Sequence, residues 1–133
     1  MEAVHAGDGD EDLGLLARVA PDLPRNIAEF ACGRIHSRAG LGRRQRQLLT
    51  IACLSVLGDC EPQLTVYVGS AAHVGLAPRE VVEAMLHCVP YVGFPRVMNA
   101  LAVAARVFAE RGLVWARKGQ LISGRPGPKD QGE

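Results

Sequence analysis

Proline and glycine divide this chain into six stretches, each with the apolar spacing of a helix. A proline near the start of a stretch suits the first helical turn, and a glycine after its last apolar residue suits the conformation that ends a helix. No long stretch alternates between apolar and polar residues with a period of two, so we expect no strands. The sequence therefore predicts an all-α fold. Its six expected helices cover residues 12–19, 24–37, 43–57, 60–74, 78–92 and 95–111.

Two of these helices are apolar on more than one face. The helix at 43–57 contains LLTIACLSVL, and the helix at 95–111 contains VMNALAVAARVF. Such a helix must be buried on all sides. Because a domain of about one hundred ordered residues offers few such positions, we expect a homo-oligomer. A compact bundle around one central helix is the alternative.

Composition excludes several classes of protein. The chain has 133 residues, and fifteen basic against fourteen acidic side chains give a formal net charge of +1, so no global field recruits nucleic acid or anionic membrane. The longest nearly apolar run, 48–57, is about half of what a membrane span needs. The acidic N-terminus lacks the hydrophobic block of a secretory signal, so we expect a cytoplasmic protein.

The two ends depart from the helical pattern. Residues 1–10 are rich in glycine and aspartate, and residues 119–133 contain four glycines and two prolines. Such segments are typical of flexible termini. We therefore expect one helical domain over residues 11–118 between two flexible ends.

Four cysteines, at positions 32, 53, 60 and 88, do not form a C-x-x-C pair. Together with the four histidines they complete no zinc pattern, so we expect no metal site. Cys53 and Cys88 lie inside apolar helical patterns, which favours reduced and mostly buried thiols over disulfides.

The expected helix at 60–74 places Cys60, Gln63 and Tyr67 on one face. A thiol in the first turn of a helix lies at the positive end of the helix dipole, which favours the thiolate, whereas neighbouring Glu61 opposes it. The structural alternatives are a packed or merely exposed thiol and a tyrosine that packs with its hydroxyl in water.

His87 and Tyr91 are spaced as i and i+4, so they share another helical face. They offer one titratable base and one phenol donor. Pro90 between them lacks a backbone donor and should kink or end the helix there. A histidine satisfied within the core is the alternative for His87.

Three stretches, read in order, are similar to the carboxymuconolactone decarboxylase family. They are FACGRIHSRAGLGRRQRQLLTIACLSVLG, EPQLTVYVGSAAHVGLAPREVVEAML and HCVPYVGFPRVMNALAVAARVF, the last with a corner at Tyr91, Gly93, Phe94 and Pro95. The resemblance spans about residues 20–112 and implies a small helical subunit assembled into trimers or hexamers. It also implies one of two chemistries: cofactor-free decarboxylation of a carboxylated muconolactone, or peroxide reduction as in relatives resembling alkylhydroperoxidase D.

The chain departs from the family pattern at three positions. Cys60 falls near the first redox cysteine, but Gln63 stands where the second would be. Tyr67 replaces the usual histidine, and Gln47 replaces the usual glutamate. Because a dithiol cycle needs a resolving thiol and a base, peroxide reduction is disfavoured.

We therefore expect a cofactor-free enzyme that acts through an enolate on a small carboxylated or enolisable ring compound. The reaction would be a decarboxylation, isomerisation or cyclisation, in catabolism or as a tailoring step in aromatic polyketide biosynthesis. A thiol-dependent peroxidase and a non-catalytic small-molecule binder are the alternatives. The expected catalytic residues are His87 as acid and base, Tyr67 as a donor, and Glu61. The expected substrate-binding residues are Tyr91, Cys60, Gln63 and Phe94.

Overall fold

Six helical segments follow one another along the chain, so the all-α fold is confirmed. The computed structural model describes residues 8–115 and 121–123. Within these ranges, no helix is long and apolar enough to cross a membrane. The segments are α1 (Asp8–Val19), α2 with the π-helix η1 (Leu23–Ile27 and Ala28–Ile35), α3 (Arg43–Leu57), α4 with the 3-10 helix η2 (Glu61–Ser70 and Ala71–Val74), α5 with α6 (Pro78–His87 and Val89–Val92), and α7 (Phe94–Glu110).

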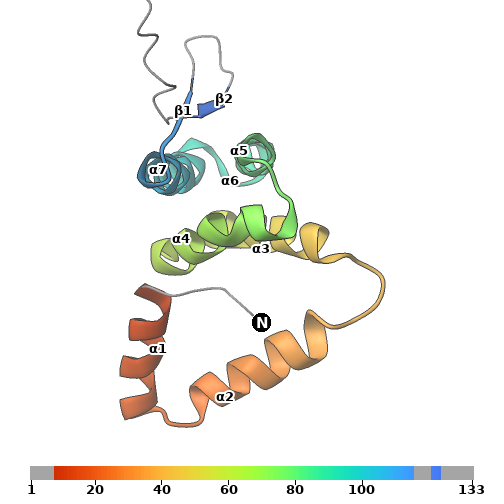
Figure 1. Ribbon diagram of the computed structural model, residues 1–133, viewed down its shortest axis with the longest axis vertical. Coiled ribbons are helices and arrows are strands. Elements are labelled where there is room, and N and C mark those ends of the chain that lie inside the picture. The colour runs from red at the N-terminus through yellow and green to blue at the C-terminus, as the bar shows by residue number, and fades with distance from the viewer. Residues whose placement is uncertain (1–7, 116–120, 124–133) are drawn as a thin grey trace, which may run out of the picture.

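The helices form three layers (Figure 1). At one end, α1 and the α2–η1 segment make a pair that we call the arm; α3 and α4 form the middle layer, and α5, α6 and α7 form the layer beyond it. The core lies between the middle and outer layers. Its largest apolar side chains at no more than 2% exposure are Ile51, Val81, Met85, Val97 and Val103. Burying a side chain of this size contributes about 1.5–3 kcal/mol, so this contact carries most of the fold's stability.

The helix expected at 78–92 is interrupted, as the position of Pro90 predicts. α5 ends at His87, and Cys88 has φ −76° and ψ −15° before α6 begins. Pro90 has no N–H to donate into the preceding turn, so the helical bonds cannot continue through it. Gly93, with φ 83°, then turns the chain into α7.

Two short strands follow α7, although we predicted none. β1 (Leu113–Trp115) pairs antiparallel with β2 (Leu121–Ser123). Three-residue strands are too short for alternation to show in a sequence. Gly112, with φ 72°, ends the helix and lets the chain leave in an extended conformation. β2 falls within the segment predicted as a flexible tail, while residues 116–120 and 124–133 lie outside the described part.

The arm has no buried side chain among residues 14–35. Leu15, Val19 and Phe30 are 60%, 83% and 60% exposed. α1 lies against α4, and Figure 1 shows the α2–η1 segment spread away from the middle layer. Because apolar burial is the main source of folding free energy, the arm gains little stability from its own chain.

Candidate functional site

Polar side chains gather where the arm meets the middle layer. η1 contributes Cys32, and the loop after it contributes the backbone carbonyl of Arg38. The first half of α3 contributes Arg46 and Gln47, and the second half of α4 contributes Tyr67 and Ser70. We call these six residues the arm junction. Their contacts make it the first candidate site.

Gln47 is the buried centre of the arm junction, at 8% exposure. Its side-chain Nε2 donates one hydrogen bond to the backbone carbonyl of Tyr67 and another to the hydroxyl of Ser70, both 2.8 Å long. Gln47 and Tyr67 therefore lie side by side. The amide of Gln47 is uncharged, so this position offers no base.

The phenol of Tyr67 is half-buried in the same junction. Burial raises the pKa of Tyr67, and the nearby Cys32 raises it further. Burial acts in this direction because it disfavours the charged form. At neutral pH Tyr67 is therefore a neutral hydrogen-bond donor and not a general base.

Arg46 joins α3 to the loop after η1. Its Nη2 donates to the backbone carbonyl of Arg38 over 2.8 Å. Its Nε is buried and has no hydrogen-bond partner among the residues that the structure describes. Sequence analysis missed Arg46, because its arginine-rich context in residues 43–46 is typical of a solvated helix face.

A second candidate lies at the turn between α3 and α4. Cys60 and Glu61 line a shallow hollow there, together with Arg96 and Asn99 of α7. The thiol of Cys60 donates to the carbonyl of Gly58 over 3.1 Å, so its hydrogen-bonding capacity is used within the turn.

Arg96 fixes this turn from the opposite layer. Its Nη1 donates to the carbonyl of Val56 over 3.2 Å and to the carbonyl of Leu57. Carbonyls at the end of a helix have no partner within the helix, and a cation there also suits the helix dipole. Gly58 has φ 71°, and a Cβ on it would overlap Nη1 of Arg96. Sequence analysis missed this contact because 39 residues separate Leu57 from Arg96.

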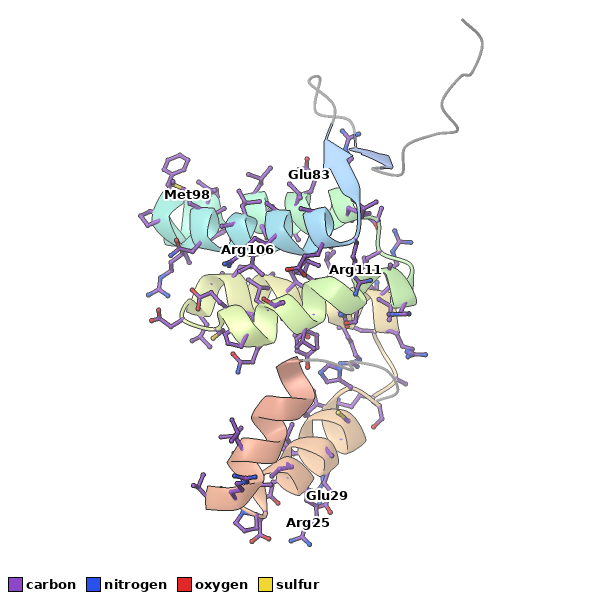
Figure 2. All side chains as sticks on the ribbon, turned by 60° about the vertical axis from the view of Figure 1, so that its left-hand side comes forward. Arg25, Glu29, Glu83, Met98, Arg106 and Arg111 are labelled. Atoms are coloured by element: carbon purple, nitrogen blue, oxygen red, sulfur yellow. The ribbon has the colours of Figure 1, made fainter. Side chains whose placement is uncertain are left out.

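His87, Tyr91 and Phe94 form a third, exposed group that we call the aromatic corner. The rings of His87 and Tyr91 lie 5.9 Å apart and are tilted by 43°. Tyr91 is 75% exposed and Phe94 69% exposed. His87 is also exposed, so the alternative of a core histidine is wrong. Met98, labelled in Figure 2, extends the apolar surface of this end of α7.

Within one chain the predicted site residues thus fall in three places. Tyr67 lies in the arm junction, and Cys60 and Glu61 lie at the α3–α4 turn. His87, Tyr91 and Phe94 lie at the aromatic corner. Gln63 is exposed on α4. One chain alone does not bring these groups to a single cavity.

The cysteines correct one further prediction. Cys53, Cys60 and Cys88 are free thiols, and Cys88 is buried, but Cys53 is exposed. Cys53 lies on an outward face of α3, whose neighbours Leu49 and Leu57 are 52% and 65% exposed. In the described ranges, no group of three or more His, Cys, Asp or Glu side chains is arranged to hold a metal ion.

Comparisons with known proteins add to this geometry. The model of the carboxymuconolactone decarboxylase family matches residues 21–106. An uncharacterized 15.0 kDa protein of Paracoccus denitrificans, encoded in the nqo9-nqo10 intergenic region, is 33% identical over 74% of this chain and 75% of its own length. The 4-carboxymuconolactone decarboxylase of Acinetobacter baylyi is 37% identical over 69% of this chain and 68% of its own length. The nitrosuccinic acid decarboxylase npaB of Metarhizium robertsii is 34% identical over 60% of this chain and 55% of its own length.

Proposed function

The chain belongs to the carboxymuconolactone decarboxylase family, and from this premise we propose that it is a cofactor-independent decarboxylase of a small carboxylated ring compound. Two of its relatives carry decarboxylase names, one for a carboxylated lactone and one for nitrosuccinic acid. Both names point to substrates that hold a carboxylate next to an electron-withdrawing group. Isomerisation or cyclisation of such a compound, as a tailoring step on an aromatic polyketide, is a variant of the same proposal.

The reaction would pass through an enolate. The bond between the ring carbon and the carboxylate breaks, carbon dioxide leaves, and the electron pair moves into the conjugated carbonyl. The enolate oxygen then needs a hydrogen-bond donor, and the carbon needs a proton. Donors already in place at the enolate oxygen cost no reorganisation when charge develops there.

Tyr67 carries the proposal as that donor. Its phenol stays neutral at physiological pH because burial raises its pKa, so it can donate to an oxygen that becomes more negative. Gln47 supports this role, since its hydrogen bond to the Tyr67 carbonyl fixes the backbone at that point of α4. Neither the proposed hydrogen bond from the Tyr67 phenol to the enolate oxygen nor the bond from Gln47 to the Tyr67 carbonyl needs a charged side chain.

His87 remains our candidate for the proton donor to carbon. Within its own chain it lies at the aromatic corner, next to Tyr91. We therefore propose that a second copy brings its corner to the arm junction of the first. Support comes from the apolar side chains exposed on both surfaces, among them Phe30 of the arm and Phe94 of the corner. A closed ring of such head-to-tail contacts gives the trimer or hexamer that the resemblance implies.

A thiol peroxidase is the weaker candidate. It would need a reactive Cys60 and a resolving partner. The thiol of Cys60 donates to the Gly58 carbonyl, and Gln63 occupies the position of the partner.

The test of the proposed function is turnover of 4-carboxymuconolactone, followed by carbon dioxide release and by loss of ultraviolet absorbance. We expect turnover by the wild type and a fall in kcat/KM of about 100- to 1,000-fold in Tyr67→Phe, the loss typical of one missing oxyanion donor. Arg106→Gln, on α7 and outside the arm junction, is the control and should retain full activity. Full activity in Tyr67→Phe would exclude the assigned role.

A further inference from the structure

We propose that Arg46 is a binding residue for the substrate carboxylate, through its buried Nε–H at the arm junction. The proposal deepens the proposed function and takes its ligand class, a small organic carboxylate, from it. The site itself rests on separate observations at Arg46: the burial of Nε, its lack of a partner, and the charge of the surrounding chain.

The first observation is the unsatisfied donor. Nε of Arg46 is buried and finds no acceptor in the part of the chain that the structure describes. Almost all buried N–H groups in native proteins have an acceptor, and a charged one left alone is especially unfavourable. A ligand with an acceptor oxygen would satisfy it. A carboxylate is the best match, because a hydrogen bond between two charged groups is the strongest of its kind.

The second observation is that the guanidinium is already held in place. Nη2 donates to the carbonyl of Arg38 over 2.8 Å, and the side chain is half-buried. A guanidinium that is fixed before a ligand arrives loses little freedom on binding. The contact to Arg38 thus positions the group that we propose binds the carboxylate.

The third observation is the local charge. Residues 30–58 contain five arginines, at 34, 38, 43, 44 and 46, and not one Asp or Glu. Glu80, on α5, pairs with Arg44. None of the six arm-junction residues is an Asp or Glu, and Arg38 and Arg46 are basic. A ligand carboxylate therefore meets positive charge from residues 30–58 and no competing carboxylate among them.

The arrangement also orients the ligand. Arg46 and Gln47 are consecutive on α3, and Gln47 bonds to the Tyr67 carbonyl. A ligand whose carboxylate is bound by Arg46 is thereby placed in the junction that contains the Tyr67 phenol. In a substrate with two carboxylates, the one bound by Arg46 is retained and the other leaves, because a cation stabilises the charged carboxylate and opposes its loss.

The test is a titration of isotope-labelled full-length protein with maleate, a small dicarboxylate, followed by backbone amide chemical shifts. We expect saturable shifts at Arg46, Gln47 and Tyr67. Arg46→Gln should weaken the affinity at least tenfold, and Arg46→Lys should weaken it severalfold, because lysine keeps the charge but lacks the Nε–H. Arg106→Gln is the matched control: Arg106 lies on α7 and lines the hollow between α4 and α7 (Figure 2), so its loss should leave the affinity unchanged.

Three results would overturn the proposal: absence of saturable shifts at the arm junction, unchanged affinity in Arg46→Gln, or wild-type affinity in Arg46→Lys. If Arg46→Gln does not fold, the lysine variant decides the question alone. The titration needs no turnover, so it is independent of the proposed reaction. Maleate binding without decarboxylase activity would leave Arg46 assigned and remove the reaction. If Arg46→Gln retained turnover with an unchanged KM, the reaction would stand and Arg46 would lose its assignment as the carboxylate-binding residue.

Discussion

The side-chain amide of Gln47, on α3, donates a 2.8 Å hydrogen bond to the backbone carbonyl of Tyr67, on α4. The contact brings together two residues that lie 20 positions apart in the chain. The amide of Gln47 is uncharged, and burial keeps the phenol of Tyr67 neutral by raising its pKa. Both groups therefore act as neutral donors.

We predict that Gln47→Glu destabilises the fold. A carboxylate in this place accepts and cannot donate, so its oxygens would face the Tyr67 carbonyl, and a buried charge would lack a partner. The expected loss is about 1–3 kcal/mol in the free energy of unfolding, measured by urea denaturation. Gln63→Glu, on the exposed face of α4, should stay within about 0.5 kcal/mol of the wild type. Equal stability of the two variants would show that the Gln47 contacts contribute nothing.

The raised pKa of Tyr67 predicts how stability changes at alkaline pH. A tyrosine in the unfolded chain ionises near its ordinary pKa of about 10, before Tyr67 does in the folded state. As the pH rises through that range, proton release favours the unfolded state, and the free energy of unfolding falls. Below that pH range the contribution of Tyr67 to the free energy of unfolding is fully present.

Urea unfolding at several pH values from neutral to alkaline checks this sign. We expect the stability of the wild type to fall more steeply above about pH 10 than that of Tyr67→Phe, which has lost the group. Tyr91→Phe is the control, because Tyr91 is 75% exposed. Parallel curves for the wild type and Tyr67→Phe would contradict the assignment of Tyr67 as a phenol kept neutral by burial.

Gly58 and Arg96 should behave as one structural unit. We predict that Gly58→Ala costs about 2 kcal/mol, because φ is 71° and the new methyl group would displace Arg96 from the carbonyls at the end of α3. In an Arg96→Ala background the same substitution should cost less, since only the backbone strain remains. The measurement is a double-mutant cycle on the free energy of unfolding. Gly93→Ala is the control for strain alone: its φ and ψ are 83° and 173°, close to the 71° and 168° of Gly58, and the added Cβ meets only Cδ of Pro95, at 3.9 Å. Strict additivity of the two substitutions would mean that Gly58 and Arg96 are independent.

The sequence predicts most of the fold because the signals that divide the helices are local. Pro90 ends α5 through its own missing N–H, and glycines end several other helices at the expected places. The contact between Arg96 and the Leu57 carbonyl has no such signal, because it depends on how α3 and α7 pack. The burial of the Arg46 Nε has no such signal either, because it depends on where the arm lies. His87 and Tyr91 could be paired from their spacing, but their exposure could not.

The separation of Tyr67 from the aromatic corner leads to our last prediction, that one active site draws on two copies of the chain. Tyr67→Phe and His87→Ala should each abolish most activity alone. If each site combines Tyr67 of one copy with the corner of the next, equal mixing of the two variants restores about a quarter of the wild-type activity, because half of the copies supply each group. If each chain holds its own site, mixing restores none.

The matched control mixes the wild type with the double variant that carries both substitutions. A shared site again gives about a quarter of the full activity, whereas a site within one chain gives about half, because every wild-type copy then works independently. The subunits are exchanged by joint denaturation and refolding, with mixed assembly verified by differently tagged copies. No recovery in the first mixture, together with half activity in the second, would confine the site to one chain and contradict the shared site.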